Sequence, residues 1–358
     1  MSIRKIIHCD CDCFYAAVEI RDNPLLCGLP IAVGGAPNSR GVIATCSYEA
    51  RQYGVRSAMS SARAAQLCPD LVFIKPNIAK YQMVSQAIHG IFKQYTDLIE
   101  PLSLDEAYLD VTDAPFCSGS ATLMAEEIRT KISRQLGITI SAGVAPNKFL
   151  AKVASDWNKP DGLFVVRPEE IGSFVERLNV SKINGVGKVT QSKLNQMGVD
   201  TCGDLQAFSE AELTQAFGQY GKRLFSVARG VDNRPIQTHR KRKSISVEHT
   251  YSKDLVSVDL ITGCVPVLMS ELRLRCERKL AQGRQVVKRF VKVKFYDFTQ
   301  TTLEHKIDNI DEDWDSNRVY SSLLEAAWAR EKKAVRLLGV GVRLGDGEVV
   351  ESRQLSLL

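Results

Sequence analysis

The first 167 residues alternate between short strand-like runs and segments with helical spacing. Strands are predicted at residues 3–13, 30–34, 41–46, 72–75 and 138–144, with two more inside 98–111. Helical spacing is found at residues 15–21, 80–95 and 121–136, and a further helix begins at residue 147. This mixture predicts an α+β fold for the N-terminal part of the chain.

The rest of the chain changes character twice. Residues 168–233 have short, glycine-punctuated helical runs, which predict a small all-α domain, and the basic residues 234–243 predict a linker. Beyond them, strands are predicted at residues 244–251, 286–297, 301–308 and 336–345, and helices at 257–281 and 317–333. That β-α-β-β-α-β order is typical of a split βαβ fold, and residues 347–358 read as a flexible tail.

Length and composition limit the kind of protein. A chain of 358 residues is too long for one ordinary hydrophobic core and predicts a multidomain protein. No apolar run approaches the ~20 residues of a membrane span, and the N-terminus lacks the apolar segment of an export signal. We therefore expect a cytoplasmic protein without a membrane partner. The net charge of +6 is informative only where the cations cluster.

The ten cysteines are scattered and lack the spacing of a secreted disulfide scaffold. Cys9, Cys11 and Cys13 alternate along the first predicted strand. A zinc site is the alternative interpretation, but no second pair of ligands follows. The pattern favours free thiols, with these three acting as small buried hydrophobic residues.

Acidic residues interrupt two apolar strands. Asp10 and Asp12 lie two positions apart, so on one strand they would share a face, with the alternating cysteines on the other. Asp105 and Glu106 are adjacent, and the backbone must turn or bulge there if both serve one site. Carboxylates of this kind suit Mg²⁺ bound together with substrate phosphates. Solvent-facing acidic strand ends are the alternative, and the acids alone leave both interpretations open.

Five blocks of sequence, in order along the chain, resemble the signature motifs of the Y-family DNA polymerases. They are residues 8–19 (HCDCDCFYAAVE), 47–56 (SYEARQYGVR), 103–110 (SLDEAYLD), 147–155 (NKFLAKVAS) and 159–162 (KPDG). Any one block would be weak evidence, whereas five in the right order are specific. The resemblance implies template-directed, Mg²⁺-dependent DNA synthesis from dNTPs onto a primer 3′-hydroxyl, of the low-fidelity translesion type without proofreading.

The resemblance also implies a right-hand architecture with a ferredoxin-like palm, small fingers, an all-α thumb and a little finger. The expected boundaries are 1–12 and 76–167 for the palm, 13–75 for the fingers, 168–233 for the thumb, 234–243 for the linker, 244–346 for the little finger and 347–358 for the tail. The split βαβ pattern falls in the little finger.

Roles in the active site follow residue by residue from the matching motifs. Asp10 and Asp105 would hold two Mg²⁺ ions, and Glu106 would complete the site beside the primer terminus. Asp12 is interpreted as a secondary or positioning residue. The expected triphosphate-binding residues are Tyr48, Arg51 and Lys159, which supply a hydroxyl donor, a bidentate fork and a point charge. Tyr15 matches the residue that would exclude a ribose 2′-hydroxyl.

Two segments are expected to contact primer–template DNA. Residues 183–188 resemble a helix-hairpin-helix loop, in which Gly185 and Gly187 let backbone N–H groups face a phosphate and Lys188 adds charge. Residues 273–294 are strongly basic, and Lys292 and Lys294 alternate with apolar residues, so both should line one sheet face. A solvated charged helix is the alternative for part of this run.

The C-terminal pentapeptide is similar to the motif by which such polymerases bind the bacterial sliding clamp. Its expected anchors are Gln354, Leu355, Leu357 and Leu358. Leu358 stands where many such motifs have Phe. The clamp, primer–template DNA and dNTP are thus the expected partners of a monomeric enzyme.

Three other functions share some of these features. A nucleotide cyclase would share the carboxylates but not the helix-hairpin-helix loop, the little finger or the tail. A DNA-binding scaffold with a decayed site would not be expected to keep the acids and the triphosphate residues. A helix-hairpin-helix nuclease or glycosylase would leave the N-terminal motifs unexplained.

Overall fold

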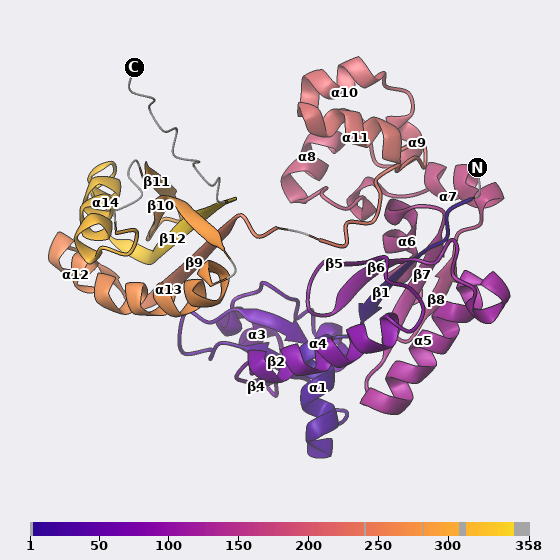
Figure 1. The fold of residues 1–358 in the computed structure, drawn as a ribbon, viewed down its shortest axis with the longest axis horizontal. Helices are drawn as coiled ribbons and strands as arrows, with labels where there is room; N and C mark the ends of the chain where they lie inside the picture. Colours follow the sequence, from indigo (N-terminus) through magenta and orange to yellow (C-terminus); the bar gives the residue numbers. More distant parts are fainter. Residues whose placement is uncertain (1–2, 240, 282, 308–312, 347–358) are drawn as a thin grey trace, which may run out of the picture. The chain divides into compact units, whose positions relative to one another are not determined.

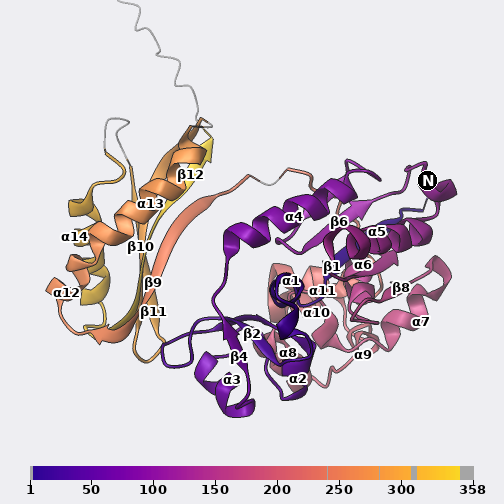
Figure 2. The same cartoon turned by 90° about the horizontal axis from the view of Figure 1, so that it is seen from below.

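The computed structural model describes residues 3–239, 241–281, 283–307 and 313–346 (Figures 1 and 2). The chain divides into two compact units, residues 1–239 and 240–358. None of the helices in the described ranges is both long and apolar enough to cross a membrane. All ten cysteines are free thiols, as the sequence predicts.

A five-stranded sheet forms the centre of the first unit, in the order β5-β6-β1-β7-β8 (Figure 1). Its strands are β1 (Ile6–Cys11), β5 (Ile99–Pro101), β6 (Glu106–Asp110), β7 (Ile140–Ala145) and β8 (Leu163–Val165). The central strand β1 runs antiparallel to both β6 and β7, and β7 is parallel to β8. Alternate side chains of β1 point to opposite faces of this sheet, and different helices cover the two faces.

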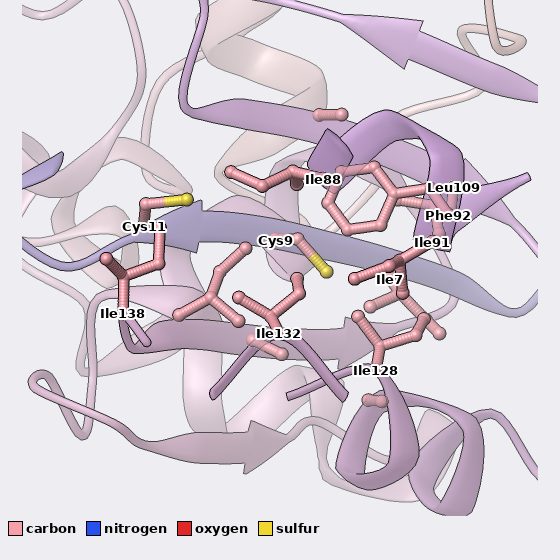
Figure 3. Packing of buried hydrophobic residues seen from close by; sticks show 14 of the residues in the cluster. Ile7, Cys9, Cys11, Ile88, Ile91, Phe92, Leu109, Ile128, Ile132 and Ile138 are labelled. Atoms are coloured by element: carbon pink, nitrogen blue, oxygen red, sulfur yellow. The ribbon is translucent and has the colours of Figure 1, made fainter. Parts of the chain in front are cut away.

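Helices cover both faces of this sheet. Ile7, Cys9 and Cys11 of β1 pack with α4 (Ile78–Phe92) and α5 (Ala121–Leu136) in one core (Figure 3). The opposite face packs against α6 (Lys148–Ser155), which contributes to a second core together with Ile6. Cys9 and Cys11 are fully or almost fully buried, which confirms them as small core residues.

The predicted first strand is wrong at its end. β1 stops at Cys11, and Cys13 takes up a left-handed backbone with a φ of 39° as the N-cap of α1 (Phe14–Asp22). Asp12 therefore lies in the turn between strand and helix instead of beside Asp10 on the strand. Cys13 is only half-buried, so it does not continue the row of core thiols.

A three-stranded sheet with its own small core follows α1 and a short 3-10 turn, η1 (Pro24–Leu26). Its order is β3-β2-β4, with β2 (Ile31–Gly34), β3 (Ile43–Cys46) and β4 (Val72–Ile74). Its helices are α2 (Tyr48–Gln52) and α3 (Ser61–Leu67). The Ser47 side chain caps α2 by accepting a hydrogen bond from the backbone N–H of Ala50, which fixes Tyr48 as the first residue of the helix.

Residues 168–233 are helical without a strand, which confirms the predicted all-α segment. Its elements are η3 (Pro168–Glu170), α7 (Ile171–Glu176), η4 (Val180–Lys182), α8 (Lys188–Gln196), α9 (Cys202–Leu205), α10 (Glu210–Phe217) and α11 (Gln219–Val227). Ser209 and Glu212 form a capping box at the start of α10. Another 3-10 turn, η2 (Phe116–Gly119), precedes α5.

The second unit is a four-stranded antiparallel sheet in the order β11-β10-β12-β9. Its elements are β9 (Ser244–Leu255), α12 (Val258–Gly263), α13 (Val265–Leu280), β10 (Arg284–Phe295), β11 (Gln300–Lys306), α14 (Asn317–Ala329) and β12 (Val335–Asp346). The three helices share one core with the sheet and lie on the same side of it (Figure 2). The sheet's other side carries no helix of this unit among its described residues.

The single helix predicted at residues 257–281 is two helices. α12 ends at Gly263, and α13 begins at Val265 with Pro266 in its first turn. Proline has no N–H to donate, so it fits the first turn of a helix but interrupts a longer one. With this one correction, the order of elements agrees with the β-α-β-β-α-β prediction.

Gly143 in β7 sets how closely α6 approaches the sheet. A Cβ at this position would lie 2.1 Å from the Ala151 carbonyl oxygen and 2.3 Å from the Ser155 nitrogen, and neither backbone atom can move cheaply. We predict that Gly143→Ala destabilises the first unit by more than about 2 kcal/mol in thermal or urea denaturation. The matched control is Gly90→Ala on α4, where a Cβ would have no neighbour within 4 Å. This variant should be neutral or slightly stabilising. Equal effects of the two variants would contradict this packing.

Candidate active site

The β1–β6 pairing places two acids directly opposite each other. Asp10 on β1 is the register partner of Glu106 on β6. Directly opposed residues of an antiparallel pair project from the same face, so both carboxylates lie on the α6 side of the sheet. The same pairing continues one step further, where the Cys11 N–H donates to the Asp105 carbonyl oxygen at 3.0 Å. Asp105 thus lies in the turn that leads into β6, as its adjacency to Glu106 requires.

A cavity of about 400 Å³ opens beside these acids. Asp10 and Asp105 line it together with Tyr15, Arg51 and Lys159, so five of the predicted site residues from four separate segments meet there. The other lining residues are Cys11, Cys13, Phe14, Ala44, Thr45, Ser57 and Asp156. Glu106 and Tyr48 are not part of the lining. Glu106 contacts Lys152 and His8, and Tyr48 contacts the lining residue Arg51.

Lys159 neutralises Asp10. Its Nζ lies 2.6 Å from Asp10 Oδ1, and both side chains are largely buried. Burial raises the pKa of Asp10 to about 6, while the Lys159 ammonium acts in the opposite direction. Burial alone would lower the pKa of Lys159, but the Asp10 carboxylate outweighs it and the net direction is upward. A carboxylate in this wall therefore requires a cation beside it.

Glu106 has a cation of its own. The Lys152 ammonium donates to Glu106 Oε2, and His8 Nε2 lies 3.3 Å from the same oxygen. Burial would raise the pKa of Glu106, but hydrogen bonds from His8 and Lys152 lower it to about 2. Burial lowers the pKa of His8 to about 4, so the ring is neutral near pH 7. Its Nδ1 contacts Ser155 Oγ at 2.8 Å.

Sequence reasoning missed His8 and Lys152. His8 precedes Asp10 by two positions on β1, so strand alternation could have placed it on the same face. Lys152 comes from α6, and only the packing of that helix on β1 brings its ammonium to Glu106. Both residues support the carboxylates from the side opposite the Ile7 core.

A divalent cation fits this group of donors. One ligand atom each from His8, Asp10 and Glu106 lie within 4.8 Å of one another, and Asp105 faces the neighbouring cavity. Hard carboxylate oxygens with room for further ligands are what Mg²⁺ requires. The two lysines now supply the positive charge that such ions would bring.

The expected triphosphate residues are held together beside the acids. The Arg51 guanidinium lies over the Tyr48 ring, 4.6 Å from its centroid, at the start of α2. The Tyr48 hydroxyl reaches across to Asp12 at 3.3 Å. Lys159 arrives from the loop between α6 and β8, so two separate segments, α2 and this loop, bring hydroxyl, guanidinium and ammonium to the cavity and its edge.

Tyr15 forms part of the cavity wall at the start of α1. Its ring stacks on Tyr81 of α4, with centroids 4.2 Å apart and an interplanar angle of 12°. Tyr81 is itself fully buried and donates a hydrogen bond to Glu19 at 2.6 Å. The Tyr15 ring therefore has a rigid support and cannot swing away easily.

Comparison with known proteins agrees with this geometry. Models of the impB/mucB/samB family and its C-terminal domain match residues 9–156 and 242–357, and a model described as the thumb domain of DNA polymerase-iota matches residues 181–232. DNA polymerase IV of Ectopseudomonas mendocina (strain ymp) is 56% identical over 97% of each chain, and that of Pseudomonas putida (strain GB-1) is 55% identical over 97% of this chain and 96% of its own.

The chain belongs to the Y family of DNA polymerases. A solved Y-family DNA polymerase chimera superposes with a TM-score of 0.86 at 29% identity, covering 95% of this chain and 98% of its own. The protein is accordingly a DNA-directed DNA polymerase of the translesion type with a right-hand architecture, acting on primer–template DNA and dNTPs. Polymerases of this family use divalent metal ions.

The helical segment of the polymerase presents the glycine loop predicted at residues 183–188. Gly185 has a φ of +101°, and its Cα faces the ring of Tyr220, where a Cβ would lie 2.7 Å from the hydroxyl oxygen. Gly187 is the N-cap of α8, and Lys188 is its first residue. Gly185, Gly187 and Lys188 are all exposed. The first N–H groups of α8 are thus available to an anion.

The sheet of the second unit has an open face that carries cations. Lys292 and Lys294 of β10 lie on this face, whereas Val291 and Val293 between and beside them are completely buried toward the helices. The alternation predicted for this strand is therefore confirmed. Lys292 pairs with Glu248 of β9 at 3.0 Å, a contact that the sequence did not indicate.

Arg289 does not belong to the exposed basic surface expected for residues 273–294. It is completely buried, and its guanidinium donates to the backbone carbonyl oxygens of Asp313 and Trp314. Strand alternation places it on the helix side, opposite Lys288 and Lys292. Arg273, in the same basic run, is paired with Asp315. The clamp-motif residues Gln354, Leu355, Leu357 and Leu358 lie outside the described residues.

His8 should make the stability of the polymerase depend on pH. Its pKa is about 4 in the folded chain against an ordinary value of 6.5, so the unfolded chain takes up the proton first. The free energy of unfolding should therefore fall as the pH is lowered from about 6.5 to about 4, by roughly 3 kcal/mol from this group. Urea titrations across this range should show a shallower slope for His8→Gln, while the exposed His239→Gln keeps the native slope. Parallel curves for all three proteins would refute the assignment.

Proposed function

We propose that Asp10 and Asp105 hold two Mg²⁺ ions and that Glu106 completes the site beside the primer terminus. The observation that carries this proposal is the register pairing of Asp10 with Glu106, together with the cavity that Asp10 and Asp105 both line. When bound, the ions would lower the pKa of the primer 3′-hydroxyl and stabilise charge on the leaving oxygen. Asp10 and Glu106 are held in place for this task by lysines that already neutralise them.

The triphosphate of the incoming nucleotide is assigned to Tyr48, Arg51 and Lys159. Arg51 offers a bidentate fork, Lys159 a point charge and Tyr48 a hydroxyl donor. We assign two roles to Lys159. It neutralises Asp10 in the ion-free site, and it is available to the phosphates once metal ions are bound. The primer 3′-hydroxyl then attacks the α-phosphate in line, and pyrophosphate leaves. This chemistry depends mainly on positioning and electrostatics.

We assign primer–template binding to two surfaces, one in the thumb and one in the little finger, within the expected right-hand division of the chain. Residues 1–12 and 76–167 form the palm, 13–75 the fingers, 168–233 the thumb and 244–346 the little finger in this proposal. In the thumb, the exposed loop of Gly185, Gly187 and Lys188 suits a phosphate at the start of α8. In the little finger, Lys292 and Lys294 project from the open sheet face and suit backbone phosphates.

Three further assignments concern the sliding clamp, the oligomeric state and the cellular compartment. We assign residues 354–358 to the bacterial sliding clamp through the anchors Gln354, Leu355, Leu357 and Leu358, joined to the little finger by the tail that begins at 347. We propose a monomer, since both substrates are bound by one chain in this account. The substrates are DNA and dNTPs, which in bacteria are in the cytoplasm, so we place the enzyme there.

Primer extension tests the metal-site assignment. With Mg²⁺ and all four dNTPs, Asp105→Ala should reduce the rate about a thousandfold or more, since a metal ligand in such a site is worth several kcal/mol of transition-state stabilisation. Asp97→Ala, an exposed acid at the far end of the sheet, is the matched control and should extend at the native rate. Native activity of Asp105→Ala, or undiminished activity of the native enzyme in excess chelator, would overturn the assignment.

The sugar assignment has a separate test. Removing the ring in Tyr15→Ala should lower discrimination against ribonucleotides by roughly one to two orders of magnitude, because the ring that would clash with a 2′-hydroxyl is lost from the cavity wall. The measurement is the ratio of kcat/KM for a dNTP and the matching ribonucleotide. Tyr53→Ala, which removes an exposed tyrosine from the same region, should leave this ratio unchanged. Unaltered discrimination in Tyr15→Ala would refute its role.

A further inference from the structure

Asp12 is the most completely hydrogen-bonded acid in the neighbourhood of the cavity among the residues described. Its side chain is 2% exposed. Oδ1 accepts from the Ser141 hydroxyl at 2.8 Å and from the Tyr48 hydroxyl at 3.3 Å. Oδ2 accepts from the Thr139 hydroxyl and from the Asp161 backbone N–H, both at 2.8 Å. These donors come from β7 and its approach, from α2, and from the loop after α6.

This pattern leaves Asp12 no free acceptor site. A carboxylate has about four lone-pair positions, and here each oxygen already accepts two hydrogen bonds. Asp12 also lies in the turn after β1, with its side chain directed to β7 instead of across to Glu106. A metal ion would have to displace one of these buried donors. Asp12 therefore differs from Asp10, whose carboxylate is paired with the Lys159 ammonium at 2.6 Å, a partner that a metal ion can replace.

Asp12 is linked to every residue assigned to the triphosphate. Its Oδ1 lies between the Tyr48 hydroxyl at 3.3 Å and the Lys159 ammonium at 3.7 Å. Arg51 in turn stacks over the Tyr48 ring at 4.6 Å. One buried carboxylate thus connects a hydroxyl, an ammonium and, through the ring, a guanidinium that come from two separate segments of the chain.

We propose that Asp12 is a positioning residue for the incoming nucleotide: it fixes Tyr48 and the Lys159 loop relative to each other, so that the triphosphate meets its three ligands in one arrangement. The inference rests on the proposed function of Tyr48, Arg51 and Lys159. A purely structural role is the alternative, in which Asp12 only anchors α2 and the loop to the sheet.

Asp12→Asn separates the two roles. The amide keeps the size of the side chain but offers one acceptor oxygen and two N–H donors. The Asp161 N–H cannot rotate to become an acceptor, so the amide oxygen should face it and the NH₂ group should face Tyr48 and Lys159. The Tyr48 hydroxyl then loses its acceptor and Lys159 loses a nearby negative charge, while the anchor to the loop is retained.

The measurement is the affinity for the incoming nucleotide under conditions in which phosphoryl transfer cannot occur. The full-length polymerase is bound to a primer–template whose primer ends in a dideoxynucleotide, and the Kd of the correct dNTP is measured in the presence of Mg²⁺. Asp12→Asn should raise this Kd about tenfold or more, the size expected for hydrogen bonds to charged groups. The affinity for the primer–template and the Tm should change little.

A double-mutant cycle with Tyr48→Phe tests whether Asp12 acts through Tyr48. If it does, the double variant should weaken dNTP binding by clearly less than the product of the two single effects. Thr139→Val provides a second variant should Asp12→Asn fold poorly: it removes one donor to Oδ2 without touching a triphosphate residue, and should raise the dNTP Kd in the same direction by a smaller factor.

The control is a second buried carboxylate. Asp232 also accepts a backbone N–H, from Phe149 at 3.1 Å, and is paired with Arg234, but it does not line the cavity. Asp232→Asn should leave the dNTP Kd unchanged. An unchanged Kd in Asp12→Asn, a shift no larger than that of Asp232→Asn, or multiplicative effects with Tyr48→Phe would each overturn the positioning role. If Arg51→Ala and Lys159→Ala also bind dNTP normally, the triphosphate assignment itself fails.

Discussion

The pairing of β1 with β6 is the constraint on which the active site depends. It places Asp10 opposite Glu106 in a largely buried wall, where two like charges cannot remain without cations. Lys159 and Lys152 meet that need in the ion-free protein, one for each acid. The elements around them, α6 above all, are arranged so that these ammonium groups reach the carboxylates. A site built in this way is ready for divalent ions, since the same negative charge attracts either kind of cation.

Most of the secondary structure could be predicted from hydrophobic periodicity. The helix at residues 121–136 was predicted with its observed bounds, and the split βαβ order of the second unit was confirmed. The errors occur where a local backbone feature overrides the periodic pattern. Cys13 turns left-handed after β1, and Pro266 begins a new helix inside an apolar run that reads as continuous.

The sequence motifs indicate Asp10, Asp105 and Glu106 as site residues, and the pairing of β1 with β6 brings Asp10 and Glu106 together. What surrounds them could not be found in this way. Lys152 reaches Glu106 only because α6 packs on β1. The four donors to Asp12 are scattered between residues 48 and 161. Such convergence depends on tertiary packing, which a linear pattern does not contain.

Counting bound divalent ions tests most directly whether Asp10 and Asp105 hold the metal. Mn²⁺ can replace Mg²⁺ and is counted by its electron paramagnetic resonance signal in the complex with dideoxy-terminated primer–template and dNTP. We expect two tightly bound ions for the native polymerase and at least about tenfold weaker binding, or fewer ions, for Asp10→Asn. If Asp10→Asn binds the same number of ions with the same affinity, Asp10 is not a metal ligand.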